Sequence, residues 1–104
     1  MVDMWTHAAT RSGDVCTVIL AGELDYDVRD ELSRVLADQV SAPGTTAVRV
    51  DMAGITFMDS SGISVLIKAY QLAEELGCRL SCVRLSAQAR RILEVTGLLS
   101  LLAE

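Results

Sequence analysis

The chain has 104 residues, of which 51% are hydrophobic, so it is long enough for one domain with a modest core and has no room for a separate catalytic domain. Its formal net charge of −5 disfavours direct binding to the phosphate backbone of nucleic acid. No apolar run approaches the roughly 20 residues that a membrane span needs, and the first seven residues lack a signal-peptide pattern, so we expect a soluble, cytoplasmic protein without membrane insertion.

The N-terminal part predicts two strands followed by a helix. We expect a short strand around Met4 to Ala9, and the β-branched run Val15–Ala21 predicts a second strand. Gly22 then predicts a turn. Asp25 or Asp27 is placed to cap the helix that follows.

Apolar residues at helical spacing define that first helix, which should end before Pro43. They are Val28, Leu32, Val35, Leu36 and Val40. A short third strand is expected at Ala47–Val50, and an Asp-Ser-Ser-Gly turn, Asp59–Gly62, leads into a second helix. The apolar stripe of this second helix, which should stop at Gly77, comprises Ile63, Leu66, Ile67, Tyr70 and Ala73. Four residues of the same helix should face water: Lys68, Gln71, Glu74 and Glu75.

The C-terminal part predicts one more strand, a helix and a final short strand. The fourth strand is expected at Arg79–Leu85, and Ser86 should cap a third helix that Gly97 closes. Leu98–Ala103 is expected to form a last strand. Strands that alternate with amphipathic helices imply βαβ units, so we predict a small α/β domain with a mixed, mostly parallel sheet and helices packed on it.

The cysteines are expected to be small buried hydrophobes. Cys16, Cys78 and Cys82 are odd in number, which disfavours a disulfide framework. On one strand Cys78 and Cys82 would lie roughly 13 Å apart, beyond the roughly 7 Å limit for a disulfide. With His7 as the single histidine, we expect no zinc site and no cofactor.

The Asp-Ser-Ser-Gly turn places serine hydroxyls at the start of a helix, where unpaired backbone N–H groups favour a cap or a phosphate. A serine-hydrolase elbow needs a glycine two residues before the serine, but Met58 stands there, and no phosphate-binding loop is present. We therefore expect no enzyme and no catalytic residue. A metal cluster of Asp25, Asp51 and Asp59 is a weaker reading than helix capping. From local spacing alone, a passive cap is the favoured interpretation of Ser60 and Ser61, and the local features do not separate it from a phosphorylated cap.

Three segments resemble the STAS-domain family of bacterial anti-sigma factor antagonists, also called anti-anti-sigma factors. They are Ala21–Asp25, Ile55–Gly62 and Leu85–Leu98, and their order and spacing cover nearly the whole chain. The resemblance implies a single STAS domain over residues 1–104. The chain stops soon after the third segment, so the additional C-terminal helix usual in the family is expected to be absent or very short.

What the resemblance implies is a phosphoprotein that regulates transcription by partner switching. The family's phosphorylated serine corresponds to Ser60, and the partner-binding positions correspond to Asp25, Asp59, Ser60, Ser61 and Gly62. The unphosphorylated protein would bind an anti-sigma factor with serine kinase activity and so release a sigma factor. The kinase would inactivate it on Ser60, and a phosphatase would restore it.

Two further readings stay open from the sequence. The chain could be a constitutive STAS scaffold or a transporter-associated subunit, in which Ser60 is no more than a helix cap. Arg79, Arg84, Arg90 and Arg91 could form a basic patch for a second partner, although a solvated face is the commoner explanation.

Overall fold

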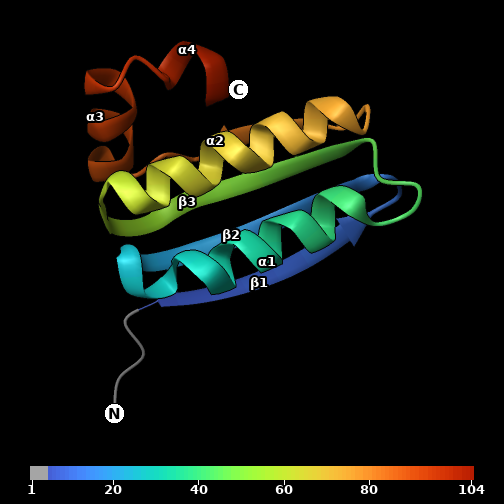
Figure 1. Cartoon of the computed structure of the whole chain (residues 1–104), viewed down its shortest axis with the longest axis horizontal. Coiled ribbons are helices and arrows are strands. Elements are labelled where there is room, and N and C mark those ends of the chain that lie inside the picture. Colours follow the sequence, from blue (N-terminus) through green and yellow to red (C-terminus); the bar gives the residue numbers. More distant parts are fainter. Residues whose placement is uncertain (1–4) are drawn as a thin grey trace.

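The computed structural model describes residues 5–104, which form a four-stranded sheet in the order β1-β2-β3-β4 with helices packed on it (Figure 1). β1 (Trp5–Ser12) runs antiparallel to β2 (Val15–Leu24). β3 (Ala47–Met58) pairs in parallel with both β2 and β4 (Arg79–Val83). This confirms the predicted mixed, mostly parallel sheet.

Two helices lie side by side on one face of the sheet (Figure 1). α1 (Arg29–Ser41) follows a short 3-10 turn, η1 (Tyr26–Val28), and α2 (Ser60–Glu75) follows β3. α3 (Ala87–Val95) packs mainly against β3, and α4 (Leu99–Leu102) is a single turn near the C-terminus. None of the helices in residues 5–104 has the length and hydropathy that crossing a bilayer requires.

The core lies between the sheet and these helices, because alternate strand residues point toward α1 and α2. In β3, for example, Val48 and Val50 are fully buried, whereas Arg49 between them is exposed on the other face. The largest fully buried side chains include Leu20, Leu24, Leu32, Leu36, Met52, Ile55, Leu66, Leu93 and Leu102.

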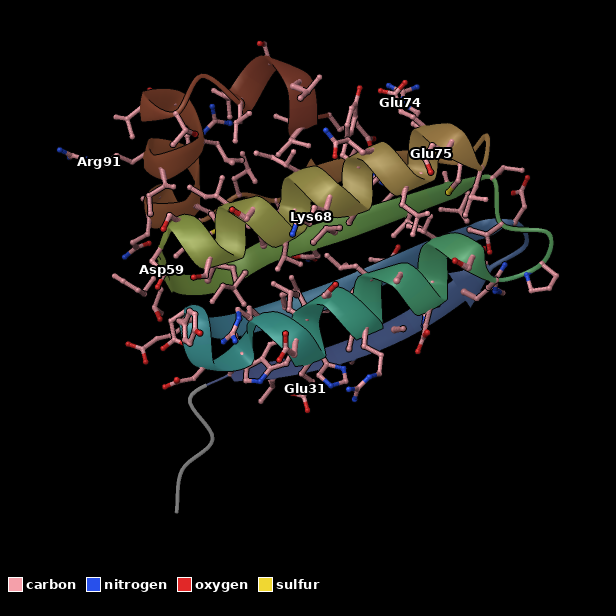
Figure 2. The ribbon with its side chains drawn as sticks, viewed as in Figure 1. Glu31, Asp59, Lys68, Glu74, Glu75 and Arg91 are labelled. Atoms are coloured by element: carbon pink, nitrogen blue, oxygen red, sulfur yellow. The ribbon has the colours of Figure 1, made fainter. Side chains whose placement is uncertain are left out.

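The amphipathic helices expected from the sequence are confirmed in their placement. α1 buries Leu32, Leu36 and Val40 and ends two residues before Pro43. Asp25, which was expected to cap the first helix, caps the 3-10 turn η1 that leads into α1. α2 exposes the side chains that were expected to face water, including Lys68, Glu74 and Glu75 (Figure 2).

Three strands are longer than the sequence predicted. β1 continues to Ser12, while Met4 of its expected start lies outside the described residues. β3 runs to Met58 rather than ending at Val50. The turn expected at Gly22 is wrong: Gly22 stays inside β2, paired with Trp5 and Ile55, and its φ of +97° is absorbed by a register shift.

The C-terminal part corrects two further expectations. β4 stops at Val83, and Arg84 leaves the strand with a left-handed backbone, φ +52°. The last expected strand is wrong, since Leu99–Leu102 is helical and only Ala103 bridges to Cys82 of β4. The helix expected after Ser86 is confirmed, because the Ser86 side chain accepts a hydrogen bond from the Ala89 N–H and caps α3.

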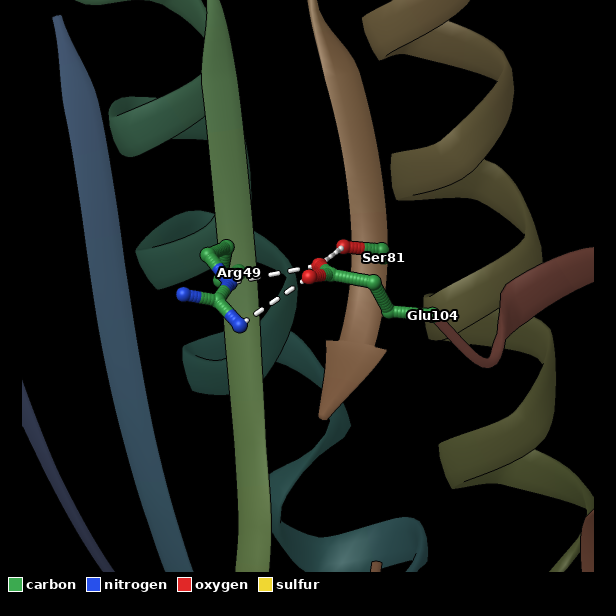
Figure 3. Close-up of polar contacts among 3 residues, drawn as sticks. All are labelled: Arg49, Ser81 and Glu104. Carbon is green, nitrogen blue, oxygen red and sulfur yellow. Dashed lines mark hydrogen bonds and ion pairs between the residues drawn. The ribbon is translucent and has the colours of Figure 1, made fainter. Parts of the chain in front are cut away.

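A polar cluster holds the C-terminal residue against the sheet (Figure 3). The Ser81 hydroxyl donates to Glu104 over 2.9 Å, and Arg49 Nη2 donates to it over 3.0 Å. The Ser81 hydrogen bond first, and the Arg49 charge after it, hold the pKa of Glu104 below its ordinary value against a raising effect of desolvation. Arg49 lies near the start of β3, so this cluster is far along the strand from Met58.

The three cysteines are free and buried, as expected. Burial raises the pKa of all three thiols, and that of Cys82 reaches about 12. Because the thiolate is the reactive form, these residues serve packing rather than chemistry.

Candidate functional site

Two neighbouring parallel strands end together, and each is followed by an aspartate. Leu24, the last residue of β2, pairs with Met58, the last residue of β3. Asp25 and Asp59 come next, both with an extended backbone: φ is −114° and −104°, and ψ is −172° in each. They lie at the carboxyl edge of the parallel strands, where open α/β sheets place functional residues. Figure 2 shows Asp59 at this end, where α2 begins.

The two aspartates cap the turns that follow them. One carboxylate oxygen of Asp59 accepts hydrogen bonds from the backbone N–H groups of Ser61, over 2.8 Å, and Gly62, over 3.3 Å. Asp25 accepts one from the N–H of Asp27 over 3.0 Å. A carboxylate here satisfies unpaired N–H groups and complements the positive end of the helix dipole. The cap of α2 is therefore Asp59 and neither of the serines, which corrects the passive-cap reading of Ser60 and Ser61.

Ser60 is the first residue of α2, and it is exposed. Its hydroxyl has no hydrogen-bond partner among residues 5–104, so it neither caps the helix nor supports the fold. Ser61 is half-buried and Gly62 is buried. Of the two serines, Ser60 is thus the one whose hydroxyl an approaching enzyme can reach.

Gly62 allows the start of α2 to sit directly on the end of β2. A Cβ atom at this position would lie 2.6 Å from the backbone oxygen of Leu24 and 3.0 Å from Cγ of Met58. The same Leu24 oxygen accepts a hydrogen bond from the N–H of Asp59 over 3.2 Å. The close packing at Gly62 and the hydrogen bond of Asp59 hold the start of α2, and with it Ser60, against the end of β2.

We predict that Gly62→Ala destabilises the protein by about 1–3 kcal/mol, the usual cost of overpacking. The obstructing atom is a backbone oxygen, which cannot swing aside, so the clash outweighs the up to about 1 kcal/mol by which alanine is favoured over glycine in a helix. Urea unfolding measures the change. The exposed Ser64→Ala in the same helix is the control, expected within about 0.5 kcal/mol of the parent. A Gly62→Ala protein as stable as the parent would contradict the packing described here.

Asp51 does not join the two capping aspartates. It lies within β3, where it is 7% exposed, accepts a hydrogen bond from the N–H of Ala53 over 3.0 Å, and pairs with Arg84 over 3.5 Å. Its expected role as a helix cap is therefore wrong. Asp25, Asp51 and Asp59 form no metal cluster, and no group of three or more potential ligands is found in residues 5–104.

The sequence leaves open whether the arginines Arg79, Arg84, Arg90 and Arg91 form a basic patch, with a solvated face as the commoner explanation. Arg84 and Arg90 line a hollow of about 440 Å³ together with Arg49. Arg79 stands at the start of β4, and Arg91 lies on the exposed side of α3 (Figure 2). Arg49 and Arg79 line a neighbouring hollow, and Arg90 and Arg91 line a third, so all four candidate arginines are exposed and share hollows with their neighbours.

Two aromatic residues beside the aspartates were missed by the sequence reasoning. Tyr26, directly after Asp25, is 59% exposed, and Phe57, two residues before Asp59, is 47% exposed. Phe57 lies beyond the strand expected at Ala47–Val50 and was considered only within the segment Ile55–Gly62 that carries the family resemblance. A signal was available, because Tyr26 stands between Asp25 and Asp27 and Phe57 comes two residues before Asp59.

Comparison with known proteins gives one family model, described as "Mlab, STAS domain", that matches residues 7–103. The chain is 25% identical to an anti-sigma F factor antagonist from Paenibacillus polymyxa over 88 residues, which are 85% of this chain and 75% of the relative. It is 29% identical to an anti-sigma-B factor antagonist from Staphylococcus epidermidis, covering 86% and 82% of the two chains. The solved structure of an anti-sigma factor antagonist from Mycobacterium paratuberculosis has the same fold, with a TM-score of 0.78 at 23% identity, covering 94% of this chain and 82% of that one.

Proposed function

This chain belongs to the STAS domain family, and from that premise we propose that it is an anti-sigma factor antagonist that is switched off by phosphorylation of Ser60. In this proposal residues 1–104 act as a single STAS domain. The unphosphorylated protein binds an anti-sigma factor that is also a serine kinase, and a sigma factor is released. A phosphatase acting on phospho-Ser60 restores binding. Binding to an anti-sigma factor is supported by the names of the two relatives from Paenibacillus polymyxa and Staphylococcus epidermidis, which are both anti-sigma factor antagonists.

The observation that carries the proposal is the exposed Ser60 hydroxyl, which has no hydrogen-bond partner among residues 5–104, beside a cap made by Asp59. Because Asp59 caps α2, the Ser60 hydroxyl is not needed as a cap and is available for modification without loss of the fold. Asp25, Ser61 and Gly62 adjoin it and form, with Asp59 and Ser60, the proposed partner surface. This role needs binding and no catalysis by the chain itself.

A phosphate on Ser60 would alter this surface by charge. It adds about −1.5 to −2 charges next to the Asp59 carboxylate. The N–H groups of Ser61 and Gly62, which would otherwise attract an anion, already donate to Asp59. The helix start therefore offers the phosphate little compensation, and like charges at a desolvated interface weaken binding.

Incubation with the cognate anti-sigma kinase and ATP is expected to add one phosphate, on Ser60. Intact-mass analysis counts the phosphates, and peptide mapping locates them. Ser61→Ala should still be modified, whereas Ser60→Ala should not. An unmodified protein, or one modified at Ser61 alone, would defeat the proposal. A constitutive scaffold or transporter-associated subunit would instead be recovered from the native host with a transporter and carry no phosphate.

A further inference from the structure

We propose that Tyr26 and Phe57 are the apolar anchors of the surface that Ser60 switches, and that the partner receives them in an apolar pocket rimmed by basic side chains. This inference rests on the proposed function and adds to it the residues that supply most of the affinity. It also states the chemistry of the partner's face.

This chain leaves two of its aromatic rings exposed. It has only four aromatic residues, and Tyr26 and Phe57 leave 59% and 47% of their surface exposed. Phe57 pairs with Glu23 across the two strand ends, and Tyr26 follows the next pair by two residues. Both rings therefore belong to the carboxyl edge that carries Ser60. A standard interface of roughly 800 Å² per partner is wide enough to include all three.

Tyr26 is held in place before any partner arrives. The guanidinium carbon of Arg29 lies 3.4 Å from the centroid of its ring, a cation–π contact. Nη1 of Arg29 also donates a hydrogen bond to the backbone oxygen of Tyr26 over 2.6 Å. A ring that is already ordered loses little conformational entropy on binding, so such a residue is suited to be an anchor.

The charges around the two rings determine the partner's chemistry. The segments 23–30 and 57–61 contain one cationic side chain, Arg29, whose guanidinium lies over Tyr26. The same segments carry five carboxylates: Glu23, Asp25, Asp27, Asp30 and Asp59. A partner face with lysine or arginine around an apolar pocket complements this arrangement. Buried aromatic anchors surrounded by polar rims are the usual pattern of energetic hot spots.

The phosphate would then act next to the anchors rather than on them. Ser60 lies three residues after Phe57, so its modification places charge at the rim of the apolar contact. Desolvating that charge is required for the rings to enter their pocket, which gives the switch its strength.

The test is calorimetric titration of the anti-sigma kinase that modifies Ser60 with Tyr26→Ala and Phe57→Ala. Each variant is expected to bind about tenfold to hundredfold more weakly than the parent. The matched controls are Leu76→Ala and Leu101→Ala, since these side chains are 53% and 47% exposed and lie at the other end of α2, Leu101 beside Glu74 and Gly77. The controls should stay within about twofold of the parent. Tyr26→Phe should retain affinity, because the ring and not the hydroxyl is the anchor.

The outcomes separate the anchors from the switch. Parent-like affinity of Tyr26→Ala and Phe57→Ala, with Ser60→Asp still weakened, would overturn the anchors and leave the proposed function intact. Weakened alanine variants with an unaffected Ser60→Asp would support the anchors and overturn the switch. Unfolding midpoints of all variants are measured alongside, and Phe57→Leu, which keeps apolar bulk, should recover affinity if Phe57→Ala is folded but weak.

Discussion

Ser60→Asp is expected to weaken binding to the anti-sigma kinase by about tenfold or more, whereas Ser60→Ala should bind like the parent. The new carboxylate stands beside the capping carboxylate of Asp59. It cannot accept a hydrogen bond from the N–H groups of Ser61 and Gly62, because both already donate to Asp59. The partner's face must desolvate both charges together. Alanine removes only a hydroxyl that has no hydrogen-bond partner in residues 5–104.

Two controls separate charge from shape and position in this experiment. Ser60→Asn has nearly the shape of aspartate without its charge, so we expect a smaller loss than for Ser60→Asp. Ser100→Asp adds the same charge to an exposed position of α4 and should leave affinity unchanged. Equal affinities of Ser60→Asp and Ser60→Ala in calorimetry would contradict the charge mechanism.

Leu24→Ala is expected to lower the free energy of unfolding by about 2–5 kcal/mol. Leu24 is fully buried at the end of β2, where its side chain packs beneath the start of α2. Truncation removes apolar contacts and leaves a cavity below Gly62. Denaturant unfolding measures the loss, and the exposed Leu76→Ala, at the end of α2, is the comparison, expected to change far less. A loss below about 1 kcal/mol for Leu24→Ala would show that the site is not supported from beneath in this way.

The acidic turns were predictable because they depend on local sequence. An aspartate after an apolar strand and before an amphipathic stretch is a strong capping signal, and both Asp25 and Asp59 cap as that signal indicates. The choice of Asp59 over the serines as the cap of α2 was not predictable from spacing, since serine and aspartate have similar capping preference. It depends on which side chain reaches the N–H groups of Ser61 and Gly62.

The sequence-based prediction of the fold was wrong where tertiary contacts override local sequence signals. Gly22 normally predicts a turn, but pairing with both neighbouring strands keeps it in β2. β3 continues past Asp51 because β2 pairs with it up to its last residue, Met58, and the buried Asp51 carboxylate forms an ion pair with Arg84. The leucine-rich C-terminus lacks the length to distinguish strand from helix, and burial of Leu102 decides for a helical turn.

The proposed partner surface was also predictable only in part from the sequence. Ser60 and its neighbours follow from the resemblance to the family, carried over position by position. The exposure of Tyr26 and Phe57 does not, because periodicity places an aromatic residue in the core by default. The structure shows that both side chains are exposed and that they lie at the paired ends of β2 and β3, which precede Asp25 and Asp59.

The most direct test of the proposed switch is the affinity of the anti-sigma kinase for the protein before and after phosphorylation of Ser60, measured by calorimetry on stoichiometrically modified material. A phosphate that costs roughly 3–4 kcal/mol at this interface would weaken binding by 10² to 10³. The two forms should have matching unfolding midpoints, because Ser60 is exposed and its hydroxyl makes no hydrogen bond within the described part of the chain. Equal affinities of the two forms would contradict the account.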